Sequence, residues 1–331
     1  MTHNIRIGIL GAAGIAPAAI IRPARAVEGA EIAAVAARDV SVAREYAAEH
    51  GIPKAHSSYE ELLADPDIDV IYNPTPNGLH GVWTVAAVQS GKHVLSEKPF
   101  TANAEEARSV AAAIRETDRT VMEAFHYRYH PVMTRALEIV RSGELGDLVS
   151  VESGFVVAGR PRDDIRWNLS LAGGGLMDVG CYPVHLVRTI VGAEPSVLSA
   201  TAVESEPGVD GEITIQLQFP GQVTGLVRSS MIATEPEVYA TITGTKGVLE
   251  IDNPFIPHNG SALTIRVGDK ERREEPSTEP SYNFQLRALL DSLNNGAPVI
   301  TDLDDAIANM VVIDAAYEAS GLGRRMPATR T

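Results

Sequence analysis

The chain has 331 residues, which at roughly 100–200 residues per domain predicts about two domains. Its 43 acidic residues outnumber 28 basic ones, and the resulting formal charge of −15 repels phosphate backbones and anionic lipid head groups. We therefore exclude nucleic acid and membrane surfaces as partners. The single cysteine, Cys181, excludes an internal disulfide framework and a multi-cysteine metal site, so we expect no metal.

The first residues contain neither a basic segment nor a long apolar stretch before the strand-like run that starts at Ile5. A secretory signal needs both features, and a transmembrane helix needs about 20 apolar residues, so we expect neither. A cytoplasmic location is the expectation that follows.

Short apolar runs alternate with alanine-rich runs of helical pattern over residues 1–124. Buried parallel strands have this appearance because helices cover both faces of the sheet, and the intervening runs are long enough for right-handed crossovers. We therefore predict that residues 1–124 form a doubly wound parallel α/β domain. The expected strands are Ile5–Leu10, Ile32–Ala36, Val70–Tyr72, Val94–Leu95 and Val121–Met122, and the expected helices are Pro17–Val27, Val42–His50, Tyr59–Ala64, Gly78–Ser90 and Asn103–Glu116.

The pattern changes over residues 125–331, where runs of alternating polarity follow one another at hairpin spacing. Turn signals such as Pro220-Gly221 separate them, which favours an antiparallel meander. We therefore predict an α+β domain with a large open, predominantly antiparallel sheet. We interpret Gly268–Pro280 as a solvated loop and allow for the last helix packing back on the first domain. The expected strands are Leu148–Val157, Val197–Val203, Glu212–Phe219, Val223–Ser230, Val238–Thr243 and Val248–Ile251, and the expected helices are Pro131–Ser142, Gly175–Val191, Tyr282–Asn294 and Leu303–Ala319.

A glycine-rich turn, Gly11-Ala12-Ala13-Gly14-Ile15, directly follows the first expected strand. Glycine there permits a tight turn and lets the N–H groups of the next helix approach a pyrophosphate. The G-x-G-x-x-G pattern is degenerate, because Ala13 and Ala16 occupy its second and third glycine positions, and an ordinary strand–helix turn is the alternative. The position at the start of a β-α-β series favours a dinucleotide.

The end of the second strand distinguishes NAD from NADP, because an NAD site uses a carboxylate there. This chain has Arg38-Asp39 at that point. Arg38 can pair with a 2′-phosphate and stack on adenine, so we predict NADP as the preferred cofactor. Two alternatives stay open: Arg38 is a solvated loop residue, or Asp39 serves NAD.

Two further loops leave the carboxyl ends of expected strands, where open α/β sheets bind ligands. The segment 73–80 is either part of the site or a rigid helix entry with Asn77 as N-cap. Glu97-Lys98-Pro99 alone resembles a surface turn. However, a lysine at the mouth of a sheet is costly to bury without a purpose, and its bond to proline permits a cis geometry.

A glycine run, Gly173-Gly174-Gly175, leads into a helix that carries Asp178, Tyr182 and His185. Their i, i+4, i+7 spacing places three titratable side chains on one helical face, which would be apolar in a simple core helix. Taken singly, Asp178 is also explained as a helix-dipole partner and His185 as a hydrogen-bonded core histidine. Pro183 predicts a kink or break near Tyr182.

The Gly11 turn, Thr75-Pro76-Asn77, Glu97-Lys98-Pro99 and the run from Gly173 to Tyr182 resemble, in this order and spacing, the glucose–fructose oxidoreductase/inositol dehydrogenase/rhizopine-catabolism (Gfo/Idh/MocA) family. The segment 123–131 is similar to its tyrosine-type branch, which includes NADP-dependent pyranose and dihydrodiol dehydrogenases and ketosugar reductases. The resemblance implies hydride transfer between a nicotinamide and a carbon of a sugar, polyol or related cyclic alcohol or ketone. It also implies that residues 1–124 are a dinucleotide-binding Rossmann domain. The second domain, 125–331, would bind the substrate and form a homodimer or homotetramer through its sheet.

The resemblance further implies roles for individual residues. Tyr182 would be the proton donor or acceptor, Lys98 would polarise the reacting oxygen, and Asp178 would orient the substrate hydroxyl or Lys98. A phenol of pKa ~10 must lose about three pKa units, roughly 4 kcal/mol, to act as a base at neutral pH, and an adjacent ammonium can supply much of this. The implied cofactor contacts are Gly11, Ala12, Ala13, Ile15, Arg38, Thr75, Asn77, His80, Glu97, Lys98, Arg166 and Trp167, and the implied substrate contacts are Lys98, Asp178, Tyr182, His185 and Arg128.

Two other functions fit the same fold. A non-catalytic regulator uses the dinucleotide as a ligand, but it has no need for the pair of Lys98 and Tyr182. A glycosidase of the family uses NAD transiently, but this chain lacks the carboxylate of the NAD type. We therefore expect an NAD(P)-dependent dehydrogenase or reductase that acts on CH–OH groups.

Overall fold

The computed structural model describes residues 4–329, which fall into two compact units. The first unit contains the residues up to Phe125, residues 282–307 and the segment from Pro327, and the second contains His126–Ser281 and Ala308–Met326. The sequence-based division differs, because it places all of 125–331 in the second domain. Residues 282–307 carry most of α8 (Ser281–Asn295) and the start of α9 (Leu303–Ala319). Leu286, Leu289 and Leu290 of α8 are buried, but periodicity alone does not say which core receives them.

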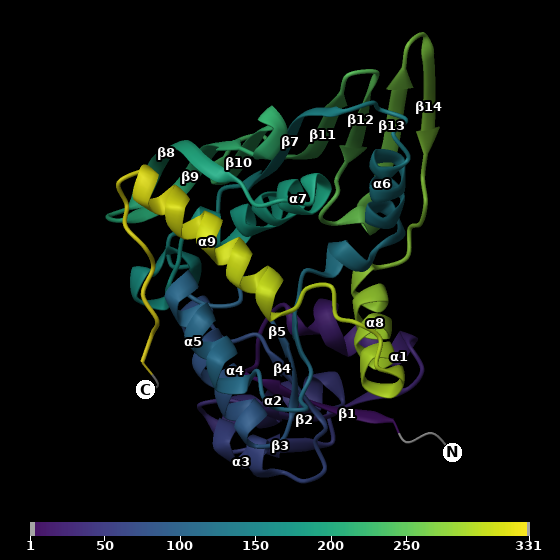
Figure 1. Ribbon diagram of the computed structural model, residues 1–331. Helices are drawn as coiled ribbons and strands as arrows, with labels where there is room; N and C mark the ends of the chain where they lie inside the picture. Colours follow the sequence, from purple (N-terminus) through teal and green to yellow (C-terminus); the bar gives the residue numbers. More distant parts are fainter. Residues whose placement is uncertain (1–3, 330–331) are drawn as a thin grey trace. The chain divides into compact units, whose positions relative to one another are not determined.

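The first unit is built on a six-stranded sheet in the order β3-β2-β1-β4-β5-β6, with every pair parallel (Figure 1). This order reverses direction at β1, so right-handed crossovers place helices on both faces. The predicted Rossmann sheet is confirmed, with one short polar strand, β3, that the sequence pattern did not reveal. The strands are β1 (Ile5–Leu10), β2 (Ala30–Ala36), β3 (Lys54–His56), β4 (Val70–Asn73), β5 (His93–Ser96) and β6 (Val121–Glu123).

The helices of the first unit follow the predicted runs. The first crossover begins with a π-helical turn, η1, at whose first position Pro17 needs no N–H partner, and continues as α1. Besides α8 and the start of α9, the helical elements are η1 (Pro17–Ile21), α1 (Arg22–Ala26), α2 (Val40–His50), α3 (Tyr59–Ala64), η2 (Asn77–Leu79), α4 (His80–Gln89) and α5 (Ala104–Ile114).

The second unit contains an eight-stranded sheet in the order β14-β13-β12-β11-β7-β10-β9-β8. Neighbouring strands are antiparallel except β10 and β7, which pair in parallel. The predominantly antiparallel sheet is therefore confirmed, but a simple meander is not. The strands are β7 (Leu148–Ala158), β8 (Ser196–Glu206), β9 (Val209–Gln218), β10 (Thr224–Ala233), β11 (Glu237–Gly244), β12 (Gly247–Asp252), β13 (Ala262–Val267) and β14 (Lys270–Glu274).

The interpretation of Gly268–Pro280 as a solvated loop is wrong in its first half, because that half forms the edge strand β14. Arg272 of this strand forms ion pairs with Glu144 and Glu274. A cluster of charged residues in the sequence favours the prediction of a solvent-exposed loop. In this segment the charged side chains instead pair with each other, and the backbone forms the hydrogen bonds of a sheet.

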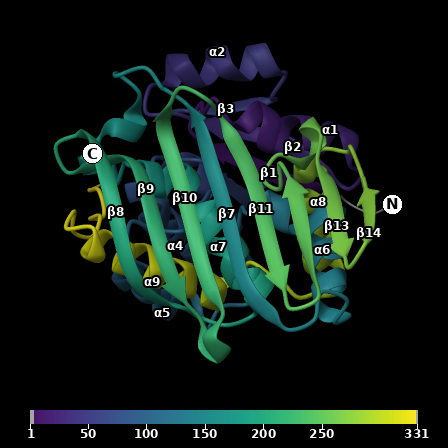
Figure 2. The same ribbon diagram turned by 90° about the horizontal axis from the view of Figure 1, so that it is seen from above.

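Helices cover one face of the large sheet. Figure 2 shows the strands side by side with α6 and α7 behind them. On β9, Ile213, Ile215 and Leu217 are buried on the covered face, and Thr214 and Gln216 lie on the other. The helical elements of this unit are η3 (His126–Tyr129), α6 (Pro131–Arg141), η4 (Ile165–Trp167), η5 (Leu169–Leu171), η6 (Leu176–Gly180), α7 (Cys181–Val191), η7 (Pro220–Gln222) and η8 (Pro257–Asn259).

Candidate active site

The glycine-rich turn follows β1 at the carboxyl edge of the parallel sheet. Gly11 has a φ of +99°, which side chains with a Cβ rarely adopt, and its N–H donates to the Ala36 carbonyl at 2.7 Å. A Cβ on Gly14 would meet no described atom within 4 Å, so space is open beside this backbone. Every residue from Gly11 to Ile15 is at least partly exposed. The turn therefore fits a pyrophosphate, which needs close approach to backbone N–H groups.

Arg38 is exposed directly after β2, and Asp39 caps α2. The Asp39 carboxylate accepts the backbone N–H of Ser41 at 2.8 Å and the Ser41 hydroxyl at 2.7 Å, and these bonds lower the pKa of Asp39. Burial raises the pKa of Tyr59, and the positive charge of Arg38 opposes that rise. The Tyr59 hydroxyl lies 3.3 Å from the position a Cβ on Gly11 would take. Arg38 thus lies beside the glycine turn through Tyr59, a residue that the sequence did not suggest.

The loop after β4 is held by its own side chains. Thr75 is 6% exposed and donates through Oγ1 to Oδ1 of Asn73 at 2.7 Å. Asn77 is half-buried and opens the 3₁₀ turn η2, whose capping position is Pro76, and α4 begins without a side-chain cap. The alternative role of Asn77 as the N-cap of this helix is therefore wrong.

His80 braces two loops. Its side chain is buried, with Nε2 2.6 Å from the Thr75 carbonyl oxygen and Nδ1 2.7 Å from the Pro99 carbonyl oxygen. Burial lowers the pKa of His80 to about 4, so its neutral ring donates to one of these two carbonyls. Both ring nitrogens face backbone carbonyls, so His80 holds the two loops together, and its cofactor contact stays a prediction.

The strand β5 leads into Glu97-Lys98-Pro99, with a cis peptide bond between Lys98 and Pro99. Glu97 is 7% exposed and its Oε1 accepts the Tyr72 hydroxyl at 2.7 Å. Burial, together with the negative charge of Glu97, raises the pKa of Tyr282 on α8. Lys98 is half-buried at the same sheet edge as Gly11. The surface-turn alternative is wrong, because Glu97 and Pro99 are both buried.

In the second unit, the backbone of Gly173-Gly174-Gly175 packs directly against the buried ion pair of Asp210 and Arg325. Gly174 has a φ of +141°, and a Cβ there would lie 2.1 Å from Oδ1 of Asp210. Asp210 accepts the Leu176 N–H at 2.6 Å and pairs with Arg325 at 2.8 Å. The helix begins with the π-helical turn η6 and continues as α7 from Cys181. Gly180 and Cys181 both have helical backbone angles, so the irregularity predicted near Tyr182 is a change of helix type rather than a break. Pro183 lies in the first turn of α7, where its missing N–H is tolerated.

Asp178 lies between two guanidinium groups. Its side chain is 12% exposed, and Oδ2 lies 2.9 Å from Nε of Arg166 and 3.2 Å from Nη2 of Arg160. Burial opposes the charge on Arg166, but Asp178 and Asp164 outweigh it and raise the pKa of Arg166. The thiol of Cys181 donates to the Asp178 carbonyl at 3.7 Å. The carboxylate is thus fixed in direction, and Arg160 is a partner that the sequence did not suggest.

Tyr182 belongs to a buried aromatic cluster. It is 6% exposed, and its ring lies 5.5 Å from the rings of Phe155 and Phe255 and 5.9 Å from that of Tyr127. The Tyr182 hydroxyl lies 3.2 Å from Nε2 of His126, which is 3% exposed. His126 is a functional candidate that sequence reasoning missed, although the segment 123–131 had drawn attention to the family.

His185 is paired inside the core. Its side chain is 1% exposed, and Nδ1 lies 2.5 Å from the Tyr127 hydroxyl. This contact matches the alternative of a hydrogen-bonded core histidine, and the substrate contact of His185 stays a prediction.

Two other predicted contacts lie apart from this helix. Trp167 is buried and its Nε1–H donates to the Pro161 carbonyl at 2.9 Å, so its polar atom holds the loop before η4. Arg128 is half-buried on η3, and among residues 4–329 no side-chain hydrogen bond or ion pair of it is found. A cofactor contact of Trp167 and a substrate contact of Arg128 remain predictions.

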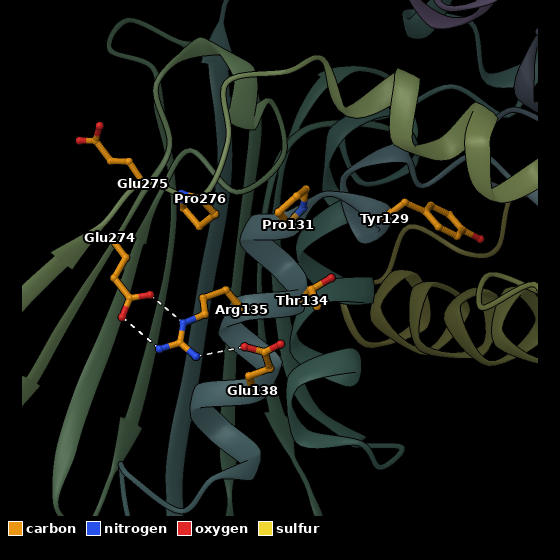
Figure 3. A pocket seen from close by; sticks show the side chains of 8 residues that line it. All are labelled: Tyr129, Pro131, Thr134, Arg135, Glu138, Glu274, Glu275 and Pro276. Carbon is orange, nitrogen blue, oxygen red and sulfur yellow. Dashed lines mark hydrogen bonds and ion pairs between the residues drawn. The ribbon is translucent and has the colours of Figure 1, made fainter. Parts of the chain in front are cut away.

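A pocket of about 450 Å³ lies elsewhere on the second unit (Figure 3). Arg135 on its wall donates to Glu274 at 2.7 and 3.1 Å and to Glu138 at 3.0 Å. All the donors named here are therefore engaged by carboxylates. The hydrogen bonds from Arg135 and Arg272 to Glu274 lower the pKa of Glu274 to about 2. No predicted site residue lines this pocket, whose residues are Tyr129, Pro131, Thr134, Arg135, Glu138, Glu274, Glu275 and Pro276.

Within residues 4–329, no three His, Cys, Asp or Glu side chains are grouped so that they could hold a metal ion. Over the same residues, no helix combines the length and apolar character needed to cross a membrane.

Comparisons with known proteins agree with this geometry. Residues 5–125 match the GFO_IDH_MocA model, described as an oxidoreductase family with an NAD-binding Rossmann fold, and residues 133–250 match the GFO/IDH/MocA C-terminal domain. D-xylose 1-dehydrogenase (NADP(+)) 2 of Haloferax volcanii is 40% identical over 96% of this chain and 97% of that protein. The chain belongs to the Gfo/Idh/MocA oxidoreductase family.

Other Gfo/Idh/MocA proteins match most of the chain. Trans-1,2-dihydrobenzene-1,2-diol dehydrogenase of Mus musculus is 37% identical over 77% of this chain and 75% of that enzyme. The structure of aldose-aldose oxidoreductase from Caulobacter crescentus, complexed with glycerol, superposes with a TM-score of 0.88 at 27% identity, covering 98% of this chain and 100% of that one. The predicted family and α/β fold are confirmed, and this Gfo/Idh/MocA protein is an NAD(P)-dependent oxidoreductase.

Proposed function

We propose that this protein transfers a hydride between NADP(H) and a carbon of a sugar, polyol or related cyclic alcohol or ketone, with Tyr182 as the acid/base. The observation that carries the proposal is the Tyr182 phenol, fixed in a buried aromatic cluster with its hydroxyl 3.2 Å from Nε2 of His126. A phenol with a titratable partner can gain and lose a proton, which a phenol that only fills the core does not need. The relatives named for xylose and dihydrobenzenediol support the substrate class.

The cofactor preference is supported at the end of β2. Asp39 is occupied as the cap of α2, and this leaves its carboxylate poorly placed to accept ribose hydroxyls. Arg38 is exposed beside the glycine turn and can pair with a 2′-phosphate. We therefore assign NADP as the preferred cofactor.

Each proposed site residue has its own chemical role. When bound, the nicotinamide supplies or accepts the hydride. Lys98 would donate to the reacting oxygen and stabilise the negative charge that develops there, and it would favour the tyrosinate form of Tyr182. Asp178, held by Arg160 and Arg166, presents a carboxylate of fixed direction that can orient a substrate hydroxyl.

We also propose that the enzyme is a homo-oligomer whose copies meet at the uncovered face of the large sheet. Val203 and Ile232 project from this face and are 52% and 38% exposed. The same face carries Thr214 and Gln216, together with Glu212 across from Val203 and Arg228 across from Thr214. Charges of both signs beside polar and apolar side chains suit a self-complementary interface between two sheets. The double variant Thr214→Arg/Gln216→Arg should be monomeric in analytical ultracentrifugation if this face joins the copies. The cytoplasmic location stays a prediction from the sequence.

A panel of aldoses, inositols and dihydrodiols, followed by nicotinamide absorbance with NADP and with NAD, tests the proposed reaction. We expect turnover of at least one member and its loss in Lys98→Met. Tight NADP binding with no turnover across the panel would instead indicate the non-catalytic regulator. Sugar release from a glycoside without net NADPH formation would indicate the glycosidase.

A further inference from the structure

Four side chains of the second unit form a continuous chain of polar contacts that begins at Tyr182. The Tyr182 hydroxyl lies 3.2 Å from Nε2 of His126, and Nδ1 of His126 lies 2.8 Å from Oγ of Ser281. Oγ of Ser281 lies 3.5 Å from Nδ1 of His258, which is the longest step. His126 and Ser281 are 3% and 0% exposed, whereas His258 is half-buried. The chain therefore leads from the proposed acid/base to a histidine that retains contact with solvent.

Donors and acceptors match along this chain in both directions. With the proton on Tyr182, the phenol donates to Nε2 of neutral His126, Nδ1–H of His126 donates to Ser281, and the Ser281 hydroxyl donates to Nδ1 of His258. When one proton has shifted along each bond, Tyr182 is a tyrosinate that accepts Nε2–H of His126, and His258 carries the additional proton. His126 and Ser281 each gain and lose one proton, so neither needs to hold a charge.

We propose that His126, Ser281 and His258 form a relay that exchanges the catalytic proton of Tyr182 with solvent, an inference that rests on the proposed role of Tyr182. Before an alcohol is oxidised, the phenol proton leaves along the relay, and His258 releases a proton from Nε2. The substrate hydroxyl then gives its proton to the tyrosinate oxygen as its carbon gives a hydride to oxidised nicotinamide. The alcohol and NADP⁺ thus yield the carbonyl compound, NADPH and one proton, and reduction runs the same steps in reverse.

The neighbouring titratable groups leave this relay intact. Burial lowers the pKa of His258, which favours the neutral ring, and this form can accept the Ser281 hydroxyl through Nδ1. Burial also lowers the pKa of the adjacent His130 to about 4, and this ring stays neutral while Nδ1 accepts a backbone N–H of α6 at 3.2 Å. Glu279 places its negative charge near His130, and its carbonyl oxygen lies 3.2 Å from Nε2 of His130. Tyr127, beside Tyr182, is bonded to His185 and forms a separate contact.

Ser281→Ala tests the relay, because it interrupts the middle and leaves the contact between Tyr182 and His126 in place. We expect kcat at pH 7–8 to fall by about tenfold, with KM for the sugar and the Kd of NADP within about twofold of their original values. Imidazole in the buffer should restore kcat in proportion to its concentration, because a small carrier replaces the missing path. His258→Gln interrupts the half-buried end with less risk to folding and should behave in the same way.

Two further variants control this experiment. Ser281→Thr returns a hydroxyl and should turn over several times faster than Ser281→Ala. Ser196→Ala, on the exposed end of β8, should match the unmodified protein at every imidazole concentration. The relay is contradicted if Ser281→Ala and His258→Gln keep kcat within twofold from pH 6 to 9, or if they lose kcat that imidazole does not restore. If Tyr182→Phe also keeps its turnover, the proposed function itself has failed, not only the relay.

Discussion

The guanidinium of Arg325, close to the end of the chain, forms an ion pair with the Asp210 carboxylate at 2.8 Å, and the two side chains are 1% and 0% exposed. Nε of Arg325 donates to the Gly173 carbonyl at 2.8 Å, and the Tyr317 hydroxyl donates to Asp210 at 2.8 Å. Asp210 also accepts the Leu176 N–H, at the start of the helix that carries Tyr182. This buried pair therefore fastens the glycine run to β9.

Arg325→Met should lower the free energy of unfolding by about 3–5 kcal/mol, because it leaves Asp210 buried and charged without its partner. Urea titration followed by circular dichroism measures this. Arg324→Met is the matched control: Arg324 is 46% exposed in its pair with Glu318, and we expect a change within about 0.5 kcal/mol. A loss below about 1 kcal/mol in Arg325→Met would show that the pair does not hold the loop.

Glu106 should make the stability of the first unit depend on pH. Burial raises the pKa of Glu106 to about 7, against the opposing N–H of Ala102, which donates at 2.8 Å. Because the pKa of Glu106 is higher in the folded state than in the unfolded state, its contribution to stability is complete below the unfolded-state pKa of about 4.5. This contribution is lost as the pH rises from about 4.5 to about 7. Glu106→Gln has no charge to bury, so we expect it to be more stable than the original by about 2–3 kcal/mol at pH 8 and equal to it at pH 4.5.

The comparison is made by urea titration at both pH values, with Glu105→Gln on the exposed side of α5 as the control. Identical urea unfolding curves for Glu106→Gln and the original protein at pH 8 would contradict a raised pKa of the Glu106 carboxyl.

Arg38→Ala should weaken NADP binding about 30-fold and leave NAD binding within about threefold, because one charge-assisted contact to a phosphate is worth about 2 kcal/mol. Isothermal titration with each dinucleotide measures both constants. Arg44→Ala, an exposed arginine of α2, removes the same charge away from the turn and should change neither. Equal weakening of NAD and NADP by Arg38→Ala would show that Arg38 does not read the 2′-phosphate.

Tyr127→Phe should cost about 1–3 kcal/mol of stability, because it takes the hydroxyl partner from Nδ1 of buried His185. KM for the sugar should stay within about twofold if His185 serves the core. A tenfold rise in KM with unchanged stability would support the predicted substrate contact of His185.

The sequence predicted those features of the fold that depend on residues close together in the chain. The apolar runs of the first half and the loops at the ends of β1, β2, β4 and β5 followed from strand periodicity and from the rule that parallel strands bind ligands at their carboxyl ends. An irregularity in the helix before Pro183, which is a change from π-helix to α-helix, followed from its missing N–H. These features depend on neighbours within about ten residues.

Hydrogen-bond and ion-pair partners that lie far apart in the chain could not be predicted from the sequence pattern. His126 and Tyr182 are separated by 56 residues, and Asp210 and Arg325 by 115. Nothing in the local sequence of either pair indicates the other member. The hydrogen-bond partners of His80 and His185 could not be predicted for the same reason, since each is a carbonyl or hydroxyl that only the fold supplies.

The central claim is that Tyr182 gives and takes the proton of the reaction. The most direct measurement is kcat of Tyr182→Phe on the best substrate of the panel, with the Kd of NADP measured on the same preparation. We predict that kcat falls at least about 100-fold while Kd changes by less than about threefold. A kcat within about threefold of the original, at unchanged Kd, would contradict the assignment.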